Sequence, residues 1–479
     1  MAKSNGSVYD KISVYAAAVV LIVLALVFYK ERVLFSDSAA YIVHIISRNH
    51  FELSLHSRFV GILSQILPLT ALRWHASLRC ILLLYSLNSI LIPVTCALLS
   101  LHWFKESRTA WSIFLFYTLM STWLFYYPVS EYQMGLCLLL FYNGAYNYYS
   151  SAGRSGTPAF LALSLLLIPV VIFSHPLAMP VFISWLLLKK ITDKYTWRQL
   201  LFPFVPALLS YLVKRLCFPV TYETDKAKGL DNFRNFSTHD LFSELGMDFV
   251  RYILHDYFLL PVLAVAVLLL LLKRKNYSGM AAFLLVLTGW WVLVTTAFSS
   301  NHYDHYYEHM YQAIPFFISL YCCHILIPAL RPYAGRLTLL LVFILSLFKI
   351  NQGRQFFEDR FAWFRRGFQL METQHCKKMA IICYVVPGGA TCPSYWSVPY
   401  ETLLLSSLDA RRSGKSIFIA GRREEAQDAV NVVYDIDPID DFPLVPERYF
   451  DIKGYPYCHP PFSEEQLSDI LHGKYSSPY

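Results

Sequence analysis

The chain has 479 residues, of which 56% are apolar and 16% aromatic, and its mean hydropathy is +0.41. Because this composition is too apolar for a soluble protein of this size, we predict an all-α polytopic membrane protein. The net charge of +8 divides unevenly, with −3 on residues 351–479 and +11 on residues 1–350. The positive-inside rule of membrane insertion accounts for the positive charge of residues 1–350. This charge is therefore no sign of nucleic-acid binding, and we expect no nucleic-acid partner.

Apolar runs that approach the ~20 residues needed to cross hydrocarbon recur along the first 350 residues. We interpret eleven of them as transmembrane helices, at residues 12–30, 79–101, 110–127, 132–149, 158–174, 176–188, 199–217, 257–272, 279–298, 312–330 and 337–350. The first follows Lys3 and Lys11 without a convincing cleavage site, so we expect it to be retained.

Short loops rich in Lys and Arg alternate with short loops that contain neither. The basic loops are 102–109, 150–158, 189–198, 273–277 and 331–336, and the loops without Lys or Arg are 127–131, 174–177 and 299–311. Because short cytoplasmic loops retain Lys and Arg, this alternation predicts a cytoplasmic N-terminus and an external C-terminus. External segments are then expected at residues 31–78, 218–256 and 351–479.

For two apolar segments, the positions of the basic loops decide how many membrane spans are counted. Phe59 to Trp74 is interrupted by Gln65 and Pro68, and counting it as a span would turn all five basic loops outward. We therefore predict an interfacial helix there. Residues 158–188 are broken near His175 by prolines, which favours two short spans over one long helix.

The external segments carry amphipathic patterns. Apolar residues at helical spacing from Tyr41 to Ile46 predict a short surface helix, and a second amphipathic helix is expected near Leu241 to Tyr257. From Asn351 the composition changes, which predicts a small α/β domain with a helix at 354–374, a helix at 400–412 and strands at 379–386, 416–420 and 430–434.

The four cysteines of the C-terminal segment do not have the paired spacing of a zinc site. They are Cys376, Cys383, Cys392 and Cys458. If this segment lies outside the cytoplasm, one or two disulfides are expected, and free thiols are the alternative.

Acidic and histidine side chains gather on the predicted external side. Asp37 follows the first span, where a carboxylate can deprotonate an acceptor hydroxyl, although Ser36 or Asp37 can also serve as the N-cap of the next helix. Glu131 and His175 fall in two short external turns. Each can cap a helix or face water, but recessed polar groups usually line a water-filled space.

The densest polar cluster precedes the span at 312–330. It contains His302, Asp304, His305, Glu308 and His309, interleaved with tyrosines. Three interpretations stay open: recognition of a sugar or polar head group through stacking and hydrogen bonds, an inert interfacial belt, and a divalent metal site. No other cofactor is expected.

Two cationic side chains depart from the alternation of the basic loops, and a third is a candidate for the same role. Lys214 and Arg215 fall at the outer end of the seventh span, and Arg58 precedes the interfacial helix. They can extend to the membrane interface, or they can hold a phosphate at the outer leaflet.

A first span followed by Asp37, surface helices in the first external segment, about eleven spans and an external C-terminal domain together resemble the GT-C class of glycosyltransferases. The similarity is closest to polyprenyl-phosphate-dependent bacterial members related to protein mannosyltransferases and aminoarabinose transferases. It implies residence in the bacterial inner membrane, with residues 1–350 as the transmembrane domain and 351–479 as a periplasmic or extracellular domain.

The resemblance also implies a reaction. Asp37 is expected to deprotonate an acceptor on a glycan, lipid or protein, which attacks a sugar on a polyprenyl phosphate with inversion. Phosphate departure then needs cationic stabilisation from Lys214, Arg215, Arg58 or His175. Glu131 and the 302–309 cluster are expected to orient acceptor or sugar, and the C-terminal domain to cover the site, to select the acceptor or to bind a protein partner.

Two other function classes remain open. A lipid or sugar transporter would share the polar groups, but no internal repeat that pairs broken helices is visible. A non-catalytic subunit of an envelope assembly would keep the architecture. Asp37 is followed by Ser38, where many GT-C members have a second acidic residue, which favours this alternative.

Overall fold

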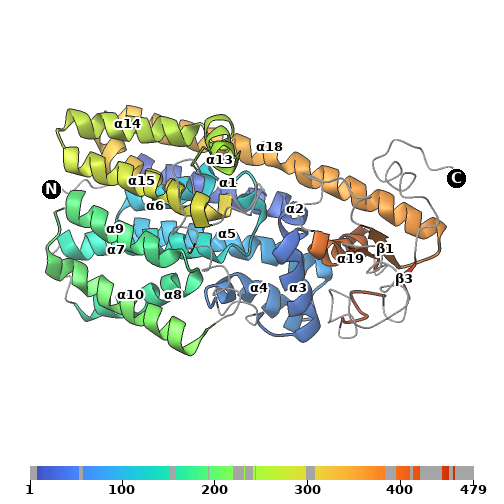
Figure 1. Cartoon of the computed structure of the whole chain (residues 1–479). Helices are drawn as coiled ribbons and strands as arrows, with labels where there is room; N and C mark the ends of the chain where they lie inside the picture. Colours follow the sequence, from blue (N-terminus) through green and yellow to red (C-terminus); the bar gives the residue numbers. More distant parts are fainter. Residues whose placement is uncertain are drawn as a thin grey trace.

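The computed structural model describes residues 8–52, 58–151, 157–192, 194–219, 231, 241–242, 244–297, 308–382, 395–409, 414–420, 445–452 and 457–458. Within these ranges the protein is almost entirely helical, with one small parallel sheet near the C-terminus (Figure 1). The helices form a bundle at one end, and α18 runs from that bundle to the sheet.

The bundle consists of apolar helices laid side by side. They are α1 (Val8–Val27), α5 (Leu78–His102), α6 (Ser107–Leu119), α7 (Glu131–Ser151), α8 (Pro158–Ser174), α9 (Ala178–Thr192), α10 (Trp197–Cys217), α14 (Leu259–Lys273), α15 (Tyr277–Ala297), α17 (Ala313–Tyr321) and the first part of α18 (Pro332–Thr373). A π-helical turn, η3 (Cys322–Leu326), and a 3-10 turn, η4 (Ile327–Ala329), follow α17.

Among the described residues, four helices are long and apolar enough to cross a membrane: α5, α10, α15 and α18. A fifth crossing is added if α14 and the helix before it, α13 (Glu244–His255), form one span bent by 85°. The protein is therefore an all-α membrane protein, as its composition predicted. The number of eleven spans stays a prediction, because several helices, such as α6 and α9, are shorter than the length needed to cross a membrane.

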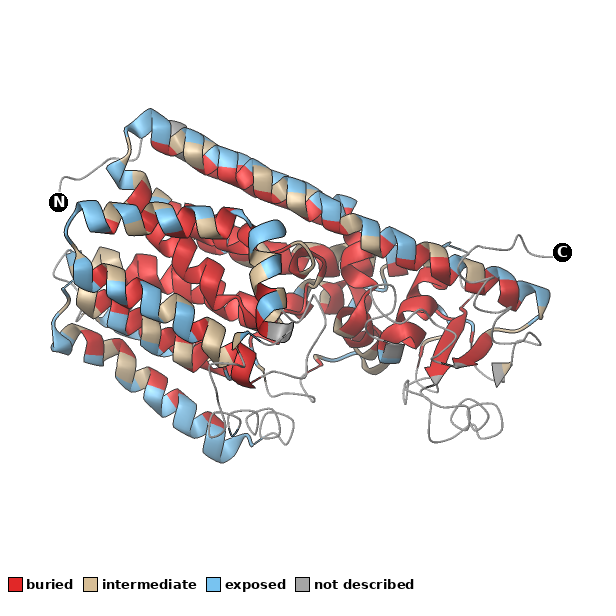
Figure 2. Cartoon of the chain, turned by 45° about the horizontal axis from the view of Figure 1, so that its top comes forward, coloured by how far each residue is buried: buried red, intermediate tan, exposed pale blue. Residues whose placement is uncertain are grey.

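The outer helices expose apolar side chains, as helices that face lipid do. Figure 2 shows exposed faces alternating with buried ones on the outer helices of the bundle. On these faces lie large apolar side chains such as Leu216, Val262, Leu269 and Leu285, all more than half exposed. The chain also turns between α8 and α9 at His175, where the sequence predicted a break between two helices.

Short helices cover the end of the bundle that faces the sheet. They are α2 (Tyr29–Val33), α3 (Ser36–Arg48), α4 (Gly61–Arg73) and α13, and a 3-10 turn, η1 (Leu124–Tyr126), lies between α6 and α7. The basic α9–α10 and α14–α15 connections lie at the opposite end of the bundle, on the left in Figure 1.

The start of α3 differs from one of the sequence interpretations. Phe35 occupies the N-cap position and makes no side-chain cap hydrogen bond, and α3 begins at Ser36. Asp37 therefore lies inside the first helical turn rather than at the N-cap. Ser36 has φ 48°, a left-handed conformation that is uncommon for a residue with a side chain.

α18 is a single helix of 42 residues. The sequence predicted a span at 337–350 and a separate helix at 354–374, but no turn interrupts the chain between them. The change in composition at Asn351 thus falls inside a continuous helix, which connects the bundle rigidly to the C-terminal segment.

The C-terminal segment contains β1 (Lys378–Ile382), η6 (Tyr395–Ser397), α19 (Val398–Asp409), β2 (Ser416–Ala420) and β3 (Tyr457–Cys458). The strand order is β2-β1-β3, and both pairs are parallel. Cys376 and Cys458 form a disulfide, whereas Cys383, Cys392 and the predicted strand at 430–434 lie outside the described residues.

One hydrophobic core joins this segment to the short helices. It contains Ile42 of α3, Phe364 of α18, Ile381 of β1 and Leu403 of α19, all buried. The sheet and α19 therefore pack against the same side chains that hold α3 in place.

Candidate functional site

The residues 121–132, which we call the connecting segment, join α6 to α7 and contact several of the polar groups that the sequence indicated. Its Tyr127 hydroxyl donates a hydrogen bond to Oδ2 of Asp37. Its last residues reach Arg58 and His309, and its η1 turn is held by Glu308. The sequence predicted a span at 110–127 followed by a short external loop at 127–131, but α6 ends at Leu119 and the chain continues as the connecting segment.

Asp37, Arg58 and Glu131 lie in one neighbourhood. Nη1 of Arg58 is 3.5 Å from Oε2 of Glu131, and these side chains are only 11% and 9% exposed. The charge of Asp37 acts on Glu131, and both carboxylates act on the hydroxyls of Tyr41 and Tyr85. Two residues of the external segment 31–78 and one of the loop 127–131 thus come together at the end of the bundle.

Burial raises the pKa of Glu131, which directly precedes the predicted span at 132–149, and the guanidinium of Arg58 opposes that shift. Removal of the Arg58 charge would leave a buried carboxylate without a cation. Arg58 thus compensates the charge of the buried Glu131 carboxylate.

Two histidines lie beside this group, on the other side of the connecting segment. The His175 and His309 rings are 5.2 Å apart, and Tyr132 contacts both, at 4.7 Å and 5.6 Å between ring centroids. Nδ1 of His309 is 3.1 Å from the Ser130 hydroxyl. Nδ1 of His175 accepts a hydrogen bond from the Leu177 amide at 3.1 Å, so neutral His175 carries its proton on Nε2.

Glu308 occupies a different kind of position. Its carboxylate is fully buried and accepts hydrogen bonds from the Trp123 amide at 2.8 Å, from the Leu124 amide and from the Tyr257 hydroxyl. Glu308 precedes the predicted span at 312–330, and burial raises its pKa to about 7 although these donors favour the charged form. This geometry favours a structural role over contact with a substrate.

Arg32 holds the same η1 turn from its carbonyl side, and the sequence interpretation missed it. The guanidinium is fully buried and donates to the Phe125 carbonyl and to the hydroxyls of Ser86, at 2.8 Å, and Ser89, at 2.6 Å. Among the described residues no carboxylate lies within ion-pair distance of it. The sequence analysis did not single out Arg32, because it follows the first span in a short run of charged residues.

The end of α10 contacts the residue that follows Arg58 through an aromatic pair. Phe218 follows the last turn of α10, and its ring is 5.5 Å from that of Phe59. Lys214 is buried and Arg215 is exposed, one turn earlier on the same helix. The structure thus places the end of α10 beside the segment that carries Arg58.

The remaining members of the polar cluster, His302, Asp304 and His305, lie outside the described residues. Within the described ranges, no three His, Cys, Asp or Glu side chains are arranged to hold a metal ion. The sequence hypothesis about a metal therefore depends on residues that the structure does not describe.

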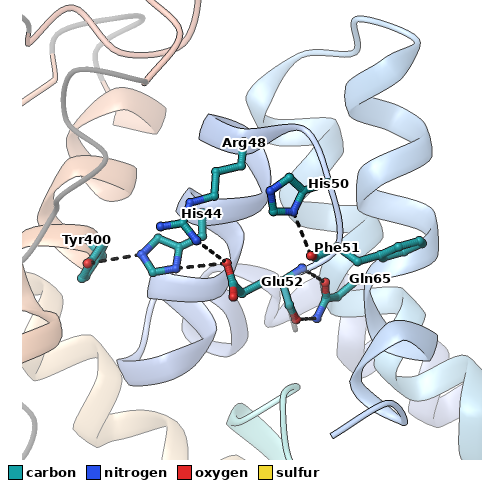
Figure 3. Close-up of polar contacts among 7 residues, drawn as sticks. All are labelled: His44, Arg48, His50, Phe51, Glu52, Gln65 and Tyr400. Carbon is teal, nitrogen blue, oxygen red and sulfur yellow. Dashed lines mark hydrogen bonds and ion pairs between the residues drawn. The ribbon is translucent and has the colours of Figure 1, made fainter. Parts of the chain in front are cut away.

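A second polar cluster links α3 to α19, as Figure 3 shows. Oε2 of Glu52 lies 3.2 Å from Arg48 and 3.5 Å from Nδ1 of His44, and Nε2 of His44 lies 3.4 Å from the Tyr400 hydroxyl. Gln65 pairs with both backbone groups of Glu52, at 2.7 and 3.0 Å. These contacts tie the end of α3 to α4 and to α19.

Comparison of the chain with protein-family models, with curated proteins and with solved structures gives no match. The class that the fold and composition define is an all-α membrane protein. Any more specific assignment rests on the residues themselves.

Proposed function

We propose that this protein is an inverting glycosyltransferase that moves a sugar from a polyprenyl phosphate to an acceptor outside the cytoplasm. The observation that supports it most is the grouping of Asp37, Arg58 and Glu131 at the end of the bundle opposite two of the basic connections. The group combines a candidate base with a cation, which are the two functions that this transfer requires.

In the proposed reaction, Asp37 takes the proton of an acceptor hydroxyl as its oxygen attacks the anomeric carbon. The bond between that carbon and the phosphate oxygen breaks, and the polyprenyl phosphate leaves with the electron pair. Tyr127 orients the carboxylate of Asp37 through its hydroxyl. Arg58 stabilises the negative charge that develops on the phosphate, and Glu131 holds Arg58 in place.

His175 and His309 have a supporting role in this proposal. Because Nδ1 of His175 accepts a hydrogen bond, the donor of the neutral ring is Nε2. A neutral imidazole that donates from Nε2 suits a sugar hydroxyl or a phosphate oxygen. Lys214 adds positive charge near the segment of Arg58.

The proposed orientation also has support at both ends of the molecule. The aromatic residues Trp103, Trp197 and Tyr333, at or next to the ends of helices that flank basic loops, are 62%, 64% and 77% exposed. Trp74, after α4, is 81% exposed. Exposed aromatic side chains at helix ends are typical of the two membrane interfaces. The Cys376–Cys458 disulfide suits a C-terminal segment outside the cytoplasm.

The test is transfer from a panel of labelled polyprenyl-phosphate sugars by the purified protein in lipid nanodiscs. Asp37→Asn is expected to reduce transfer by about 10²- to 10⁴-fold, the usual contribution of a general base. Asp256→Asn is the control, since Asp256 follows α13 and contacts His255 at 3.0 Å. Undiminished transfer by Asp37→Asn would exclude it as the base.

The same assay addresses the alternatives. If the wild-type protein transfers no sugar from any donor of the panel, a non-catalytic subunit becomes the better interpretation. Movement of labelled donor across vesicle membranes without transfer would favour a transporter.

A further inference from the structure

A fully buried ion pair lies between the end of α18 and α19. Nε and Nη2 of Arg360 donate to the two carboxylate oxygens of Glu401 at 2.7 and 2.9 Å, and both side chains are 0% exposed. The guanidinium also lies over the Phe35 ring, at 5.5 Å. A two-point contact of this kind fixes the plane of the carboxylate as well as its position.

Glu401 uses the same carboxylate to hold the first residue of α3. Its Oε1 accepts a hydrogen bond from the Ser36 amide at 3.0 Å and one from the Ser397 hydroxyl at 2.6 Å. The first amides of a helix lack partners within the helix, and Phe35 does not supply one from the N-cap position. Glu401 therefore caps α3 from a position 365 residues later in the chain.

The capped residue has an unusual backbone conformation. Ser36 has φ 48°, a conformation that costs a residue with a side chain about 1–3 kcal/mol and persists only where the surrounding contacts impose it. Its amide is the atom that Glu401 contacts, and Asp37 is the next residue. The hydrogen bond thus stabilises the turn that directs Asp37 toward Tyr127.

We infer that the C-terminal segment controls the geometry of the candidate base, and that Glu401, held by Arg360, is a positioning residue for Asp37. The inference rests on the proposed function of Asp37. It gives the C-terminal segment a defined task, because loss of contact between α19 and α3 releases Ser36 and misplaces the carboxylate. A displacement of about 1 Å can cost roughly 10²-fold in rate.

The most informative variant is the double substitution Arg360→Met with Glu401→Leu. Replacing both members of a buried pair by apolar residues is often neutral for stability, whereas removal of one leaves an unpaired buried charge. The double variant therefore removes the acceptor of the Ser36 amide while the core stays filled. Glu401→Gln is the second variant, because it keeps one oxygen for that amide.

The control is Asp409→Ala. Asp409 is another carboxylate of α19 and binds Lys30 of α2 at 3.1 Å and Arg365 of α18 at 3.2 Å. It thus links α19 to α2 and α18, and neither of these bonds involves Ser36. A general loosening of α19 would affect the control and the double variant alike.

The first measurement is hydrogen exchange of the peptide that covers residues 34–41, read by mass spectrometry in nanodiscs. The double variant is expected to speed exchange at the start of α3 by about 10- to 100-fold, the value of a hydrogen bond to a charged group. Glu401→Gln should cause a smaller increase and Asp409→Ala none. Exchange that is equal in all proteins would overturn the inference, and this result does not depend on activity.

The second measurement is the transfer assay. The double variant is expected to lower kcat by about 10- to 100-fold with KM unchanged, since substrate binding does not depend on the orientation of the Asp37 carboxylate. In an Asp37→Asn background it should cause no further loss. A full additional loss in that background would show that Arg360 and Glu401 do not act through Asp37. Absence of transfer by the wild-type protein would defeat the proposed function, and the exchange result would then remain as the test of Glu401.

Discussion

Substitution of Glu308 by alanine tests how the connecting segment is held. Glu308 joins the η1 turn to the break between α13 and α14, because its carboxylate accepts from two backbone amides and from the Tyr257 hydroxyl. Alanine leaves these three donors buried without an acceptor. Each unsatisfied donor costs about 1–3 kcal/mol, and since the costs are not additive we expect a loss of about 3–5 kcal/mol in the free energy of unfolding.

Glutamine at position 308 separates charge from hydrogen bonding. Its carbonyl oxygen replaces one of the two acceptors, while its amide nitrogen is a donor and opposes the amides that face it. We expect a loss of about 1–2 kcal/mol relative to the wild-type protein near neutral pH. A loss as large as that of Glu308→Ala would mean that the charge itself holds the turn.

The pH dependence gives a sharper result. Burial raises the pKa of Glu308 from an ordinary 4.5 to about 7, so the folded protein binds this proton more tightly than the unfolded chain does. The stability contributed by the proton is fully present below pH 4.5 and is lost as the pH rises toward 7. One pKa unit corresponds to 1.36 kcal/mol, so the loss is about 3 kcal/mol.

The assay is thermal unfolding in nanodiscs between pH 4.5 and 8. The wild-type protein is expected to lose more stability over this range than Glu308→Gln, whose side chain does not titrate. The control is Glu358→Gln, because the Glu358 carboxylate is 44% exposed and pairs with Arg354 on the surface of α18. Equal pH dependence in the wild-type protein and Glu308→Gln would refute a buried carboxyl group with a raised pKa.

Two further predictions concern packing and covalent structure. Gly353→Ala is expected to destabilise the protein by about 1–3 kcal/mol, because a Cβ there would lie 2.8 Å from Thr122 Cγ2 and closer still to the Thr122 carbonyl. Gly289→Ala, where no atom lies within 4 Å, should be neutral or slightly stabilising in the same unfolding assay. Cys376→Ser is expected to lower stability by about 2–4 kcal/mol, since the disulfide closes a loop with a sequence separation of 82. Treatment of the wild-type protein with a reductant should reproduce that loss, and a Cys376→Ser protein as stable as the oxidised wild type would contradict it.

Local pattern accounts for the features that depend on neighbouring residues. The apolar runs predicted the helices of the bundle, and the prolines around His175 predicted the break between α8 and α9. Amphipathic spacing predicted α3 and α13 within a few residues of their observed bounds. These features follow from periodicity and backbone chemistry, which a short window of sequence contains.

Contacts between residues far apart in the sequence could not be predicted from local pattern. Asp37 was assigned either to catalysis or to a helix cap, and the structure shows that Glu401 caps α3 and that Asp37 contacts Tyr127 instead. Arg32 and Glu308 have no local signal of burial, because Arg32 follows Lys30 and Glu31, and Glu308 lies in a run of His, Asp and Tyr. A contact across hundreds of residues leaves no periodicity in either segment.

The sequence by itself determined that this is a membrane protein of apolar helices, and it predicts which groups share an external face. These conclusions depend on composition and on the cost of placing charge in hydrocarbon, which are properties of each segment taken alone. Only the tertiary structure decided that the connecting segment brings Asp37 and Tyr127 together next to Arg58 and Glu131, and that α19 supplies the cap of α3. The physical reason is that buried donors and charges must find partners wherever packing places them, whatever their distance along the chain.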